Sequence, residues 1–400
     1  MKEIRVRHCV EYHIIHSMKS LWVTIGELVG ALTGSLIRCV RNPQGKPVGR
    51  ALIIYITDPF KRGSRGSVQH SNMQEAIIMA DVLSEIGFYV DVMDYRNRFP
   101  VNVGKYDLII GFGDCYEKIF YTDNKAIKIY YATGAPQSVH CFAEVARIRQ
   151  ARKKNRHVFP KRVLDRSWPC SELLSNAIIS VTDGWAMEQF SKNHPNVYSV
   201  PVTSLCSINP RSLVLDKKQD NRFVWFGSRG ALHKGLDLCL EAVANMPDVI
   251  LHVCGFVDYE PDFVDAYKKE LRLPNIRFHG FLRVDSNQMR DIMSVASYVI
   301  LPSCSEGCAT SVLTCMSWGC IPVVSEQSGI TFENRVLIEE LTTQSVRKAI
   351  TKCLSMSKSE RVELMRESAE WIRRKHSIPM YKKSLMSVIS KIMKEYVREA

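Results

Sequence analysis

Two basic residues in the second half of the chain have the spacing to bind a phosphorylated ligand. Arg229 and Lys234 are five positions apart in the stretch FGSRGALHKG, between an apolar run and the start of an expected helix. A helix N-terminus offers backbone N–H groups and a partial positive charge, so two added cations would favour a diphosphate there. A solvated loop between a strand and a helix explains the same two residues equally well.

A single carboxylate, Glu306, occupies the corresponding loop further along, in PSCSEGCATSVLTCMSWG. It could accept hydrogen bonds from sugar hydroxyls, or it could cap the next helix, which is worth about 0.5–2 kcal/mol to stability. Four cysteines lie in or next to this stretch: Cys304, Cys308, Cys315 and Cys320. They lack the paired C-x2-4-C knuckles of zinc sites, so we expect small buried thiols that fit a helix against a sheet.

The elements that must position these residues alternate between strands and helices in two series. In the first half, runs such as ALIIYIT (51–57) and DLIIGFG (107–113) are typical of strands buried on both faces of a parallel sheet. The polar stretch 208–221 precedes a second series, which begins at RFVWFG. The sequence therefore predicts an α/β protein with two Rossmann-like domains facing across a cleft and a helical C-terminal tail.

Changes in composition set the expected domain limits. We expect an N-terminal extension with an amphipathic helix, two Rossmann-like domains and a final helix that packs back on the first domain. Their predicted ranges are 1–48, 49–208, 221–376 and 377–400.

The extension contains an apolar stretch, 21–37, that is expected to be a helix. One stripe of it is apolar: Leu21, Ile25, Leu28, Leu32 and Leu36. A membrane-spanning helix needs about 20 apolar residues with few charges, whereas this stretch is shorter and contains Glu27. It could lie on a membrane surface or pack on the protein, and the sequence leaves both alternatives open.

The formal charge of +13 is concentrated in one segment. Between Arg147 and Arg166 there are nine Lys or Arg residues and one acid, Asp165. This excess indicates an anionic partner, such as a phospholipid surface or the phosphates of a lipid-linked acceptor, although a solvated helix face fits about as well. Aromatic residues are sparse here, so nucleic acid is disfavoured. Thirteen cysteines without regular spacing indicate a reducing compartment, which favours the cytoplasm.

Five segments together resemble the nucleotide-binding half of the family 4 retaining glycosyltransferases, which have the GT-B fold. These are FGSRGALHKGLDLCLEAV, VILHVCG, NIRFHGFL, ILPSCSEG and MSWGCIPVVS. The first half is similar mainly in fold. The resemblance implies a hexosyltransferase-like enzyme that transfers a sugar, with retention, from a nucleotide-diphosphate sugar to a glycan or polyprenyl-linked acceptor. It also implies a role in bacterial surface polysaccharide synthesis, peripheral on the inner face of the cell membrane.

The resemblance also implies roles for individual residues. Arg229 and Lys234 would be the R-x4-K pair that holds the diphosphate, and Glu306 would be the first acid of the E-x7-E motif, which contacts the donor sugar. Further donor-binding positions would be Gly227, Ser305, Gly307, Cys308 and Thr314. Because the two cations can neutralise the leaving group and the chain has no D-x-D pair, no metal or other cofactor is expected.

Two departures from the family pattern favour an alternative. The second motif acid is replaced by Thr314, whose neutral hydroxyl should bind ribose more weakly. The histidine expected after a central strand is replaced by Thr133. Acceptor-side candidates that remain are His140, Asp114 and His70. The alternative is a catalytically inactive GT-B scaffold that binds partners or glycans. A dinucleotide oxidoreductase is disfavoured, because GSRGSVQH lacks the third glycine of the fingerprint.

Overall fold

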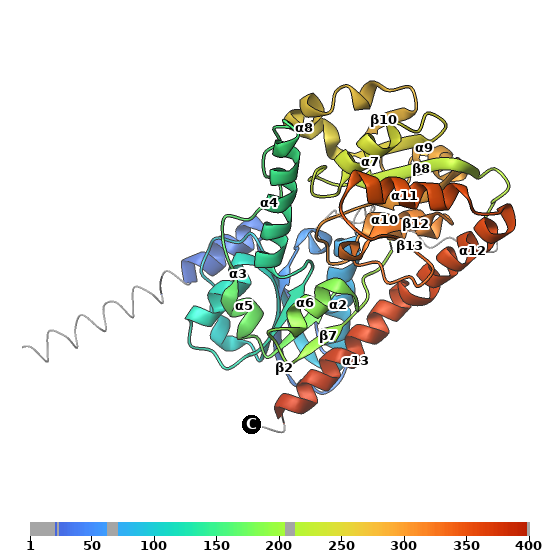
Figure 1. The fold of residues 1–400 in the computed structure, drawn as a ribbon. Helices are drawn as coiled ribbons and strands as arrows, with labels where there is room; N and C mark the ends of the chain where they lie inside the picture. The colour runs from blue at the N-terminus through green and yellow to red at the C-terminus, as the bar shows by residue number, and fades with distance from the viewer. Residues whose placement is uncertain (1–20, 22–23, 62–70, 205–212, 398–400) are drawn as a thin grey trace, which may run out of the picture.

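The computed structural model of the chain describes residues 21, 24–61, 71–204 and 213–397, and it divides into two α/β halves (Figure 1). Each half is built on one sheet whose central strands are buried runs of β-branched and other apolar residues. Such runs are expected where helices cover both faces of a parallel sheet.

The first sheet has seven strands in the order β1-β3-β2-β4-β5-β6-β7. The strands are β1 (Leu36–Arg41), β2 (Gly49–Tyr55), β3 (Phe88–Asp94), β4 (Leu108–Gly111), β5 (Ile127–Ala132), β6 (Ala177–Ser180) and β7 (Val197–Ser199). All are parallel except β1, which pairs antiparallel with β3 at the edge. The order reverses direction around β2, which is where ligands of open α/β sheets bind.

The helices of this half follow the strands in turn. They are η1 (Asp58–Phe60), α2 (Ser71–Ile86), η2 (Val103–Lys105), α3 (Gly113–Lys118), η3 (Ile119–Tyr121), α4 (Gln137–Lys153), α5 (Pro169–Leu173) and α6 (Trp185–Ser191). Helix α2 is followed by Gly87, whose φ of +118° is a conformation that glycine adopts without strain.

The second sheet has six parallel strands in the order β10-β9-β8-β11-β12-β13. They are β8 (Gln219–Gly227), β9 (Ile250–Gly255), β10 (Ile276–Gly280), β11 (Ala296–Leu301), β12 (Ile321–Ser325) and β13 (Val336–Ile338). The α-helices are α7 (Leu236–Val243), α8 (Pro261–Ala266), α9 (Asn287–Val295), α10 (Thr310–Ser317), α11 (Thr343–Leu354), α12 (Lys358–Lys375) and α13 (Ile378–Val397). Short 3-10 turns complete this half: η5 (Phe256–Tyr259), η6 (Glu270–Arg272) and η7 (Glu326–Ser328).

The expected helix over 21–37 is wrong in its last turn. Its described helical residues end at 33, and 36–41 form the edge strand β1. Gly34 has a φ of +66°, which breaks the helix, and Leu36 beyond it is buried. The sequence pattern missed this change because Leu36 continues the apolar helical spacing.

This N-terminal helix packs on the domain through glycine and exposes its apolar stripe. A Cβ on Gly26 would lie 2.5 Å from the carbonyl oxygen of Pro100, so only glycine fits at that contact. Four stripe residues on the opposite face are 42–79% exposed: Leu21, Ile25, Leu28 and Leu32. Within the described part of the chain, that stripe is therefore not packed on the protein. No helix in the described ranges has the length and apolar character to cross a membrane.

Two helices connect the halves. The long helix α13 runs from the second half back along the first, where it contacts α2 (Figure 1). The Tyr381 hydroxyl of α13 lies 3.0 Å from the Tyr131 hydroxyl of β5. Helix α4 stands between the halves, with its C-terminal end beside α8 (Figure 1).

The basic segment 147–166 binds the second half of its own chain. Four of its side chains form ion pairs with acids there: Arg147 with Asp237, Lys154 with Glu241, Arg156 with Glu270 and Lys161 with Asp262. For these four side chains, the anionic partner expected from the sequence is the neighbouring domain.

Candidate functional site

Lys234 and Glu306 meet at the edge of the second sheet. Lys234 follows β8 and Glu306 follows β11, and these strands are parallel neighbours, so their carboxyl ends deliver both loops to one place. The Lys234 Nζ donates a hydrogen bond to Oε1 of Glu306, and both side chains are buried. The Ser303 Oγ donates to the same oxygen at 3.0 Å. Glu306 therefore holds a charged partner and is not a helix cap.

The charges around this pair favour the ionised form of Glu306. Burial alone would raise the pKa of Glu306, but the positive charges of Lys234 and Arg162 outweigh it and hold that pKa well below its usual range. Burial lowers the pKa of Lys234, and the charge of Glu306 opposes that shift. A carboxylate paired with an ammonium group in a buried place interacts strongly, because little water screens the two charges.

Arg229 does not join the pair. Its side chain is exposed and forms no hydrogen bond or ion pair with the rest of the described chain. Its backbone carbonyl accepts a hydrogen bond of 3.4 Å from Arg162, and a Cβ on Gly230 would lie 2.6 Å from Cδ of Arg162. Arg229 is thus on the same loop as Lys234, at its exposed rim, while Arg162 passes over the loop from the first domain.

The backbone N–H groups expected to bind a diphosphate are largely taken. Those of Gly230 and Ala231 donate to the carboxylate of Glu260, which is buried. Those of Lys234 and Gly235 donate to backbone carbonyls in the turn before α7. The expectation that this helix start presents free N–H groups is therefore wrong for these four, because an internal acid and the turn already satisfy them.

The glycines and small residues around the pair make close contacts between loops. Gly227 lies under Lys234, since a Cβ there would be 3.1 Å from its Cδ. A Cβ on Gly307 would lie 2.5 Å from the carbonyl oxygen of Thr133 in the first domain. Gly307 thus lets the two domains approach each other at the point where the sequence has Thr133 in place of the family histidine.

The other expected donor-binding residues are more varied. The buried Ser305 Oγ has no hydrogen-bond partner among the described residues, and its carbonyl binds His233. The Cys308 thiol is half-buried, and burial raises its pKa, so it is inert. Thr314 is buried on α10, where its hydroxyl donates to the carbonyl of Thr310 at 2.9 Å. Among the described residues, Glu306 is bonded to Lys234 and Ser303 and Thr314 to Thr310, with no hydrogen bond between the two motif positions.

The acceptor-side candidates separate into different places. His140 lies beside the site, with its ring centroid 4.7 Å from that of His233. Asp114 binds Arg166 and accepts a hydrogen bond of 2.8 Å from the Trp168 indole, which gives it a structural role within the first domain. His70 lies outside the described residues.

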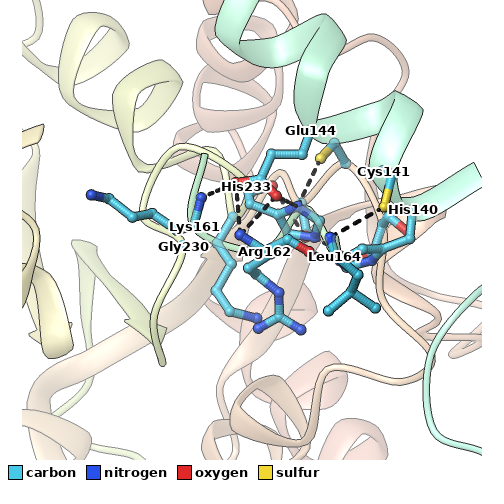
Figure 2. Close-up of polar contacts among 12 residues, drawn as sticks. His140, Cys141, Glu144, Lys161, Arg162, Leu164, Gly230 and His233 are labelled. Carbon is cyan, nitrogen blue, oxygen red and sulfur yellow. Dashed lines mark hydrogen bonds and ion pairs between the residues drawn. The ribbon is translucent and has the colours of Figure 1, made fainter. Parts of the chain in front are cut away.

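Sequence reasoning missed three residues that border the site. Arg162 and Glu144 come from the first domain and Glu260 from the second; the carboxylate of Glu144 accepts hydrogen bonds from the backbone N–H groups of Lys161 and Arg162 (Figure 2). The signal for Glu144 was present, because it lies one helical turn after His140 and therefore on the same face of α4. Arg162 was hidden in the basic segment, where composition does not distinguish one cation from another.

A second buried acid, Glu75, lies in the first domain. Its Oε2 accepts hydrogen bonds of 3.1 Å from the hydroxyls of Tyr55 and Tyr131, and Tyr131 in turn contacts Tyr381 of α13. Burial raises the pKa of Glu75 to about 7, because few groups nearby compensate the charged form.

This pKa predicts how stability depends on pH. The folded chain keeps a proton on Glu75 up to about pH 7, whereas the unfolded chain releases it near 4.5. Stability from this group is thus greatest below pH 4.5 and should fall by roughly 3 kcal/mol as pH rises to 7 and above. Glu75→Gln should remove that fall in urea unfolding at pH 5 and pH 8. Glu85→Gln, on the same helix but outside this hydroxyl network, is the control, and equal slopes for both variants would contradict the assignment.

Comparison with known proteins agrees with this architecture. Residues 220–356 match the family model described as glycosyl transferases group 1. No curated protein matches the sequence of the chain.

Solved structures of similar fold cover most of the chain. Sucrose-phosphate synthase from Thermosynechococcus elongatus aligns with a TM-score of 0.59 and 12% identity over 90% of this chain and 100% of its own. HepE from Anabaena, in complex with UDP and glucose, aligns with a TM-score of 0.54 and 12% identity, over 86% of this chain and 99% of its own. WaaG, a glycosyltransferase involved in lipopolysaccharide biosynthesis, aligns with a TM-score of 0.53 and 13% identity, over 84% of this chain and 99% of its own. At these identities the likeness establishes the fold, and the prediction of two Rossmann-like domains of GT-B type is confirmed.

Proposed function

We propose that the protein is a glycosyltransferase that takes a hexose-like sugar from a nucleotide-diphosphate sugar, with retention, and adds it to a glycan or polyprenyl-linked acceptor. The observation that carries the proposal is the buried contact between Lys234 and Glu306 at the carboxyl edge of the second sheet. A match of that half to a glycosyltransferase family model supports it, as do solved neighbours that hold UDP with a sugar.

The geometry supports two functions that such a transfer needs, namely stabilisation of the leaving diphosphate and binding of the donor sugar. Departure of a nucleoside diphosphate leaves negative charge on the phosphates, and a preorganised cation stabilises that charge as it develops. Lys234, Arg162 and Arg229 provide three cations from two loops. In the structure Lys234 is paired with Glu306; a diphosphate would compete for Lys234 and leave Glu306 to accept hydrogen bonds from sugar hydroxyls. With these cations present, we propose that the transfer itself needs no metal.

The proposal is tested by measuring melting temperatures of the full chain with UDP-, GDP-, ADP- and CMP-linked sugars. A ligand that binds only the folded state at 100 times its Kd stabilises by about 2.7 kcal/mol, which is readily measured. Donors that stabilise should then be hydrolysed or transferred, and the anomeric configuration of the product reports retention. Neither stabilisation nor turnover with any donor would favour the catalytically inactive scaffold, the alternative motivated by Thr314 and Thr133.

We propose further that the N-terminal helix places the enzyme on an anionic phospholipid surface at the inner face of the membrane. Its exposed stripe is Leu21, Ile25, Leu28 and Leu32. Two basic side chains, Arg38 and Lys105, border the helix and bind Glu27, and Lys61 lies against Gly34. An exposed apolar stripe beside basic residues suits the boundary between headgroups and acyl chains. Surface polysaccharide synthesis from a lipid-linked acceptor is consistent with that position.

The double substitution Leu28→Ser with Leu32→Ser should weaken binding to vesicles that contain phosphatidylglycerol by roughly 100-fold. The reason is that burial of each leucine side chain in the membrane contributes about 1.5 kcal/mol or more to the binding free energy. Vesicle flotation of the full chain measures the effect. Leu354→Ser, which changes an exposed leucine at the end of α11, should bind as the wild type does. Unchanged flotation of the double variant would remove the helix from the membrane contact.

A further inference from the structure

Side chains from both domains converge beside the Lys234–Glu306 pair with the chemistry of metal ligands. His140 and Glu144 project from α4, and His233 precedes Lys234 in the chain (Figure 2). Cys304 follows β11. One ring nitrogen of each histidine and one oxygen of Glu144 lie within 4.8 Å of one another. Glu144, His233 and Cys304 are 1%, 0% and 3% exposed, so these three side chains are shielded from water, whereas His140 is half-buried.

The distances around His233 are close to those of a tetrahedral zinc site. Its Nδ1 lies 3.4 Å from the Cys304 Sγ and 3.9 Å from Oε2 of Glu144. Ligand atoms bound to zinc at about 2.0–2.3 Å in a tetrahedron are roughly 3.3–3.5 Å apart. The contact with sulfur fits directly, and the contact with the carboxylate needs a shift of about half an ångström on the same basis.

The hydrogen bonds of the two rings leave a nitrogen of each able to bind a metal. The Nε2 of His233 is 2.6 Å from the carbonyl oxygen of Ser305, and the Nε2 of His140 is 3.1 Å from that of Arg162. A carbonyl only accepts, so each Nε2 carries the hydrogen and the other nitrogen keeps its lone pair. Metal-binding histidines typically have this second contact, which fixes the ring and its tautomer.

Glu144 also has a free position at which its carboxylate could bind a metal. Its Oε2, the atom that faces His233, accepts one backbone hydrogen bond, from Arg162 at 2.9 Å. A carboxylate oxygen has two acceptor positions, so one remains for a metal.

We propose that His140, Glu144 and His233 bind a divalent transition metal, with Cys304 as the fourth ligand. Nitrogen, oxygen and sulfur together in a tetrahedral arrangement suit Zn²⁺. On binding, the Cys304 thiol loses its proton to water and the thiolate bonds to the metal, which neither oxidises nor reduces any group. The metal would join α4 of the first domain to the loops that carry Lys234 and Glu306, and so hold the domains together with the site assembled. It lies beyond the transfer chemistry proposed above and does not depend on it.

The experiment uses the full chain, stripped with a chelator and dialysed against Zn²⁺ or Co²⁺. We expect one tightly bound metal per chain by elemental analysis and, with Co²⁺, a thiolate-to-cobalt charge-transfer band. His140→Gln should weaken metal binding by more than the roughly 10–100-fold typical of losing an outer-shell partner. Cys304→Ser should remove the charge-transfer band. Cys141→Ser is the matched control, because Cys141 adjoins His140 on α4 but lies outside the cluster, and it should keep both metal and band.

The variants should fold, so a loss of metal binding can be interpreted directly. The His140 ring is only half-buried, so its variant should fold, and Glu144→Gln keeps an oxygen for the N–H groups of Lys161 and Arg162. Zn²⁺ should raise the melting temperature of the wild type and of Cys141→Ser, but not of His140→Gln. Absence of tight metal in the wild type would overturn the proposal, as would binding that neither His140→Gln nor Glu144→Gln weakens. A cobalt spectrum without the charge-transfer band would overturn the assignment of Cys304.

Discussion

Replacing Lys234 with methionine should lower the rate of sugar transfer by about 10²–10³-fold or more, the usual cost of losing one group that stabilises developing negative charge. Lys234 is the only one of the three cations in contact with Glu306 among the described residues. Because the charge of Lys234 would face the leaving diphosphate, its loss should lower kcat. Product formation with a sugar donor that raises the melting temperature of the wild type measures this effect.

The same substitution should also cost stability. In a polar loop, a lysine would be replaceable at little cost, but Lys234 is buried against Glu306. Removing one partner of a buried ion pair leaves the other charge uncompensated, which typically costs 3–5 kcal/mol.

The matched control is the double variant Lys234→Met with Glu306→Gln, which removes both charges. It should recover most of the lost stability in urea unfolding, because no unpaired charge remains, but it should not recover activity. A folded double variant that transfers sugar at the wild-type rate would show that the pair has no part in the reaction.

Arg147→Ala should lower the free energy of unfolding by about 3–5 kcal/mol, the second large effect. The guanidinium of Arg147 donates to Oδ2 of Asp237 across the domain boundary, and both side chains are 3% exposed. Burial raises the pKa of Asp237 and the charge of Arg147 opposes that shift, so removal of the arginine leaves a buried acid without its main compensating charge. Urea unfolding monitored by circular dichroism measures the loss.

Two variants separate the ion pair from the helix that carries it. Arg149→Ala changes an exposed arginine two positions further along α4 and should stay within about 0.5 kcal/mol of the wild type. Arg147→Ala combined with Asp237→Asn, measured beside each single variant, completes a double-mutant cycle and should be less destabilised than Arg147→Ala alone. A loss below 1 kcal/mol for Arg147→Ala would mean that water reaches Asp237 in the folded chain.

The candidate site is formed by residues that are far apart in the sequence. Lys234 and Glu306 follow neighbouring parallel strands of one sheet. From the other domain, Arg162 acts on Glu306 and Glu144 lies beside His233. The ion pairs of Arg147, Lys154, Arg156 and Lys161 hold α4 and the segment after it in that position. The charge of the basic segment therefore assembles the site from within the chain.

The sequence by itself determined the two α/β halves and placed Lys234 and Glu306 in loops that follow strands. Buried strands read as β-branched runs, and parallel strands bring the loops after their carboxyl ends to one edge, so local pattern and topology are enough. It also located the apolar stripe of the N-terminal helix.

Only the tertiary structure decided which way that stripe faces, because Gly26 allows an approach to Pro100 that no apolar periodicity records. It likewise decided that Glu260 occupies the backbone N–H groups of Gly230 and Ala231, and that Arg162 rather than Arg229 acts on Glu306. These outcomes depend on contacts between distant segments. Ion pairing and burial determine which of several residues of the same charge makes a contact. The spacing of residues along the chain does not predict which one it is.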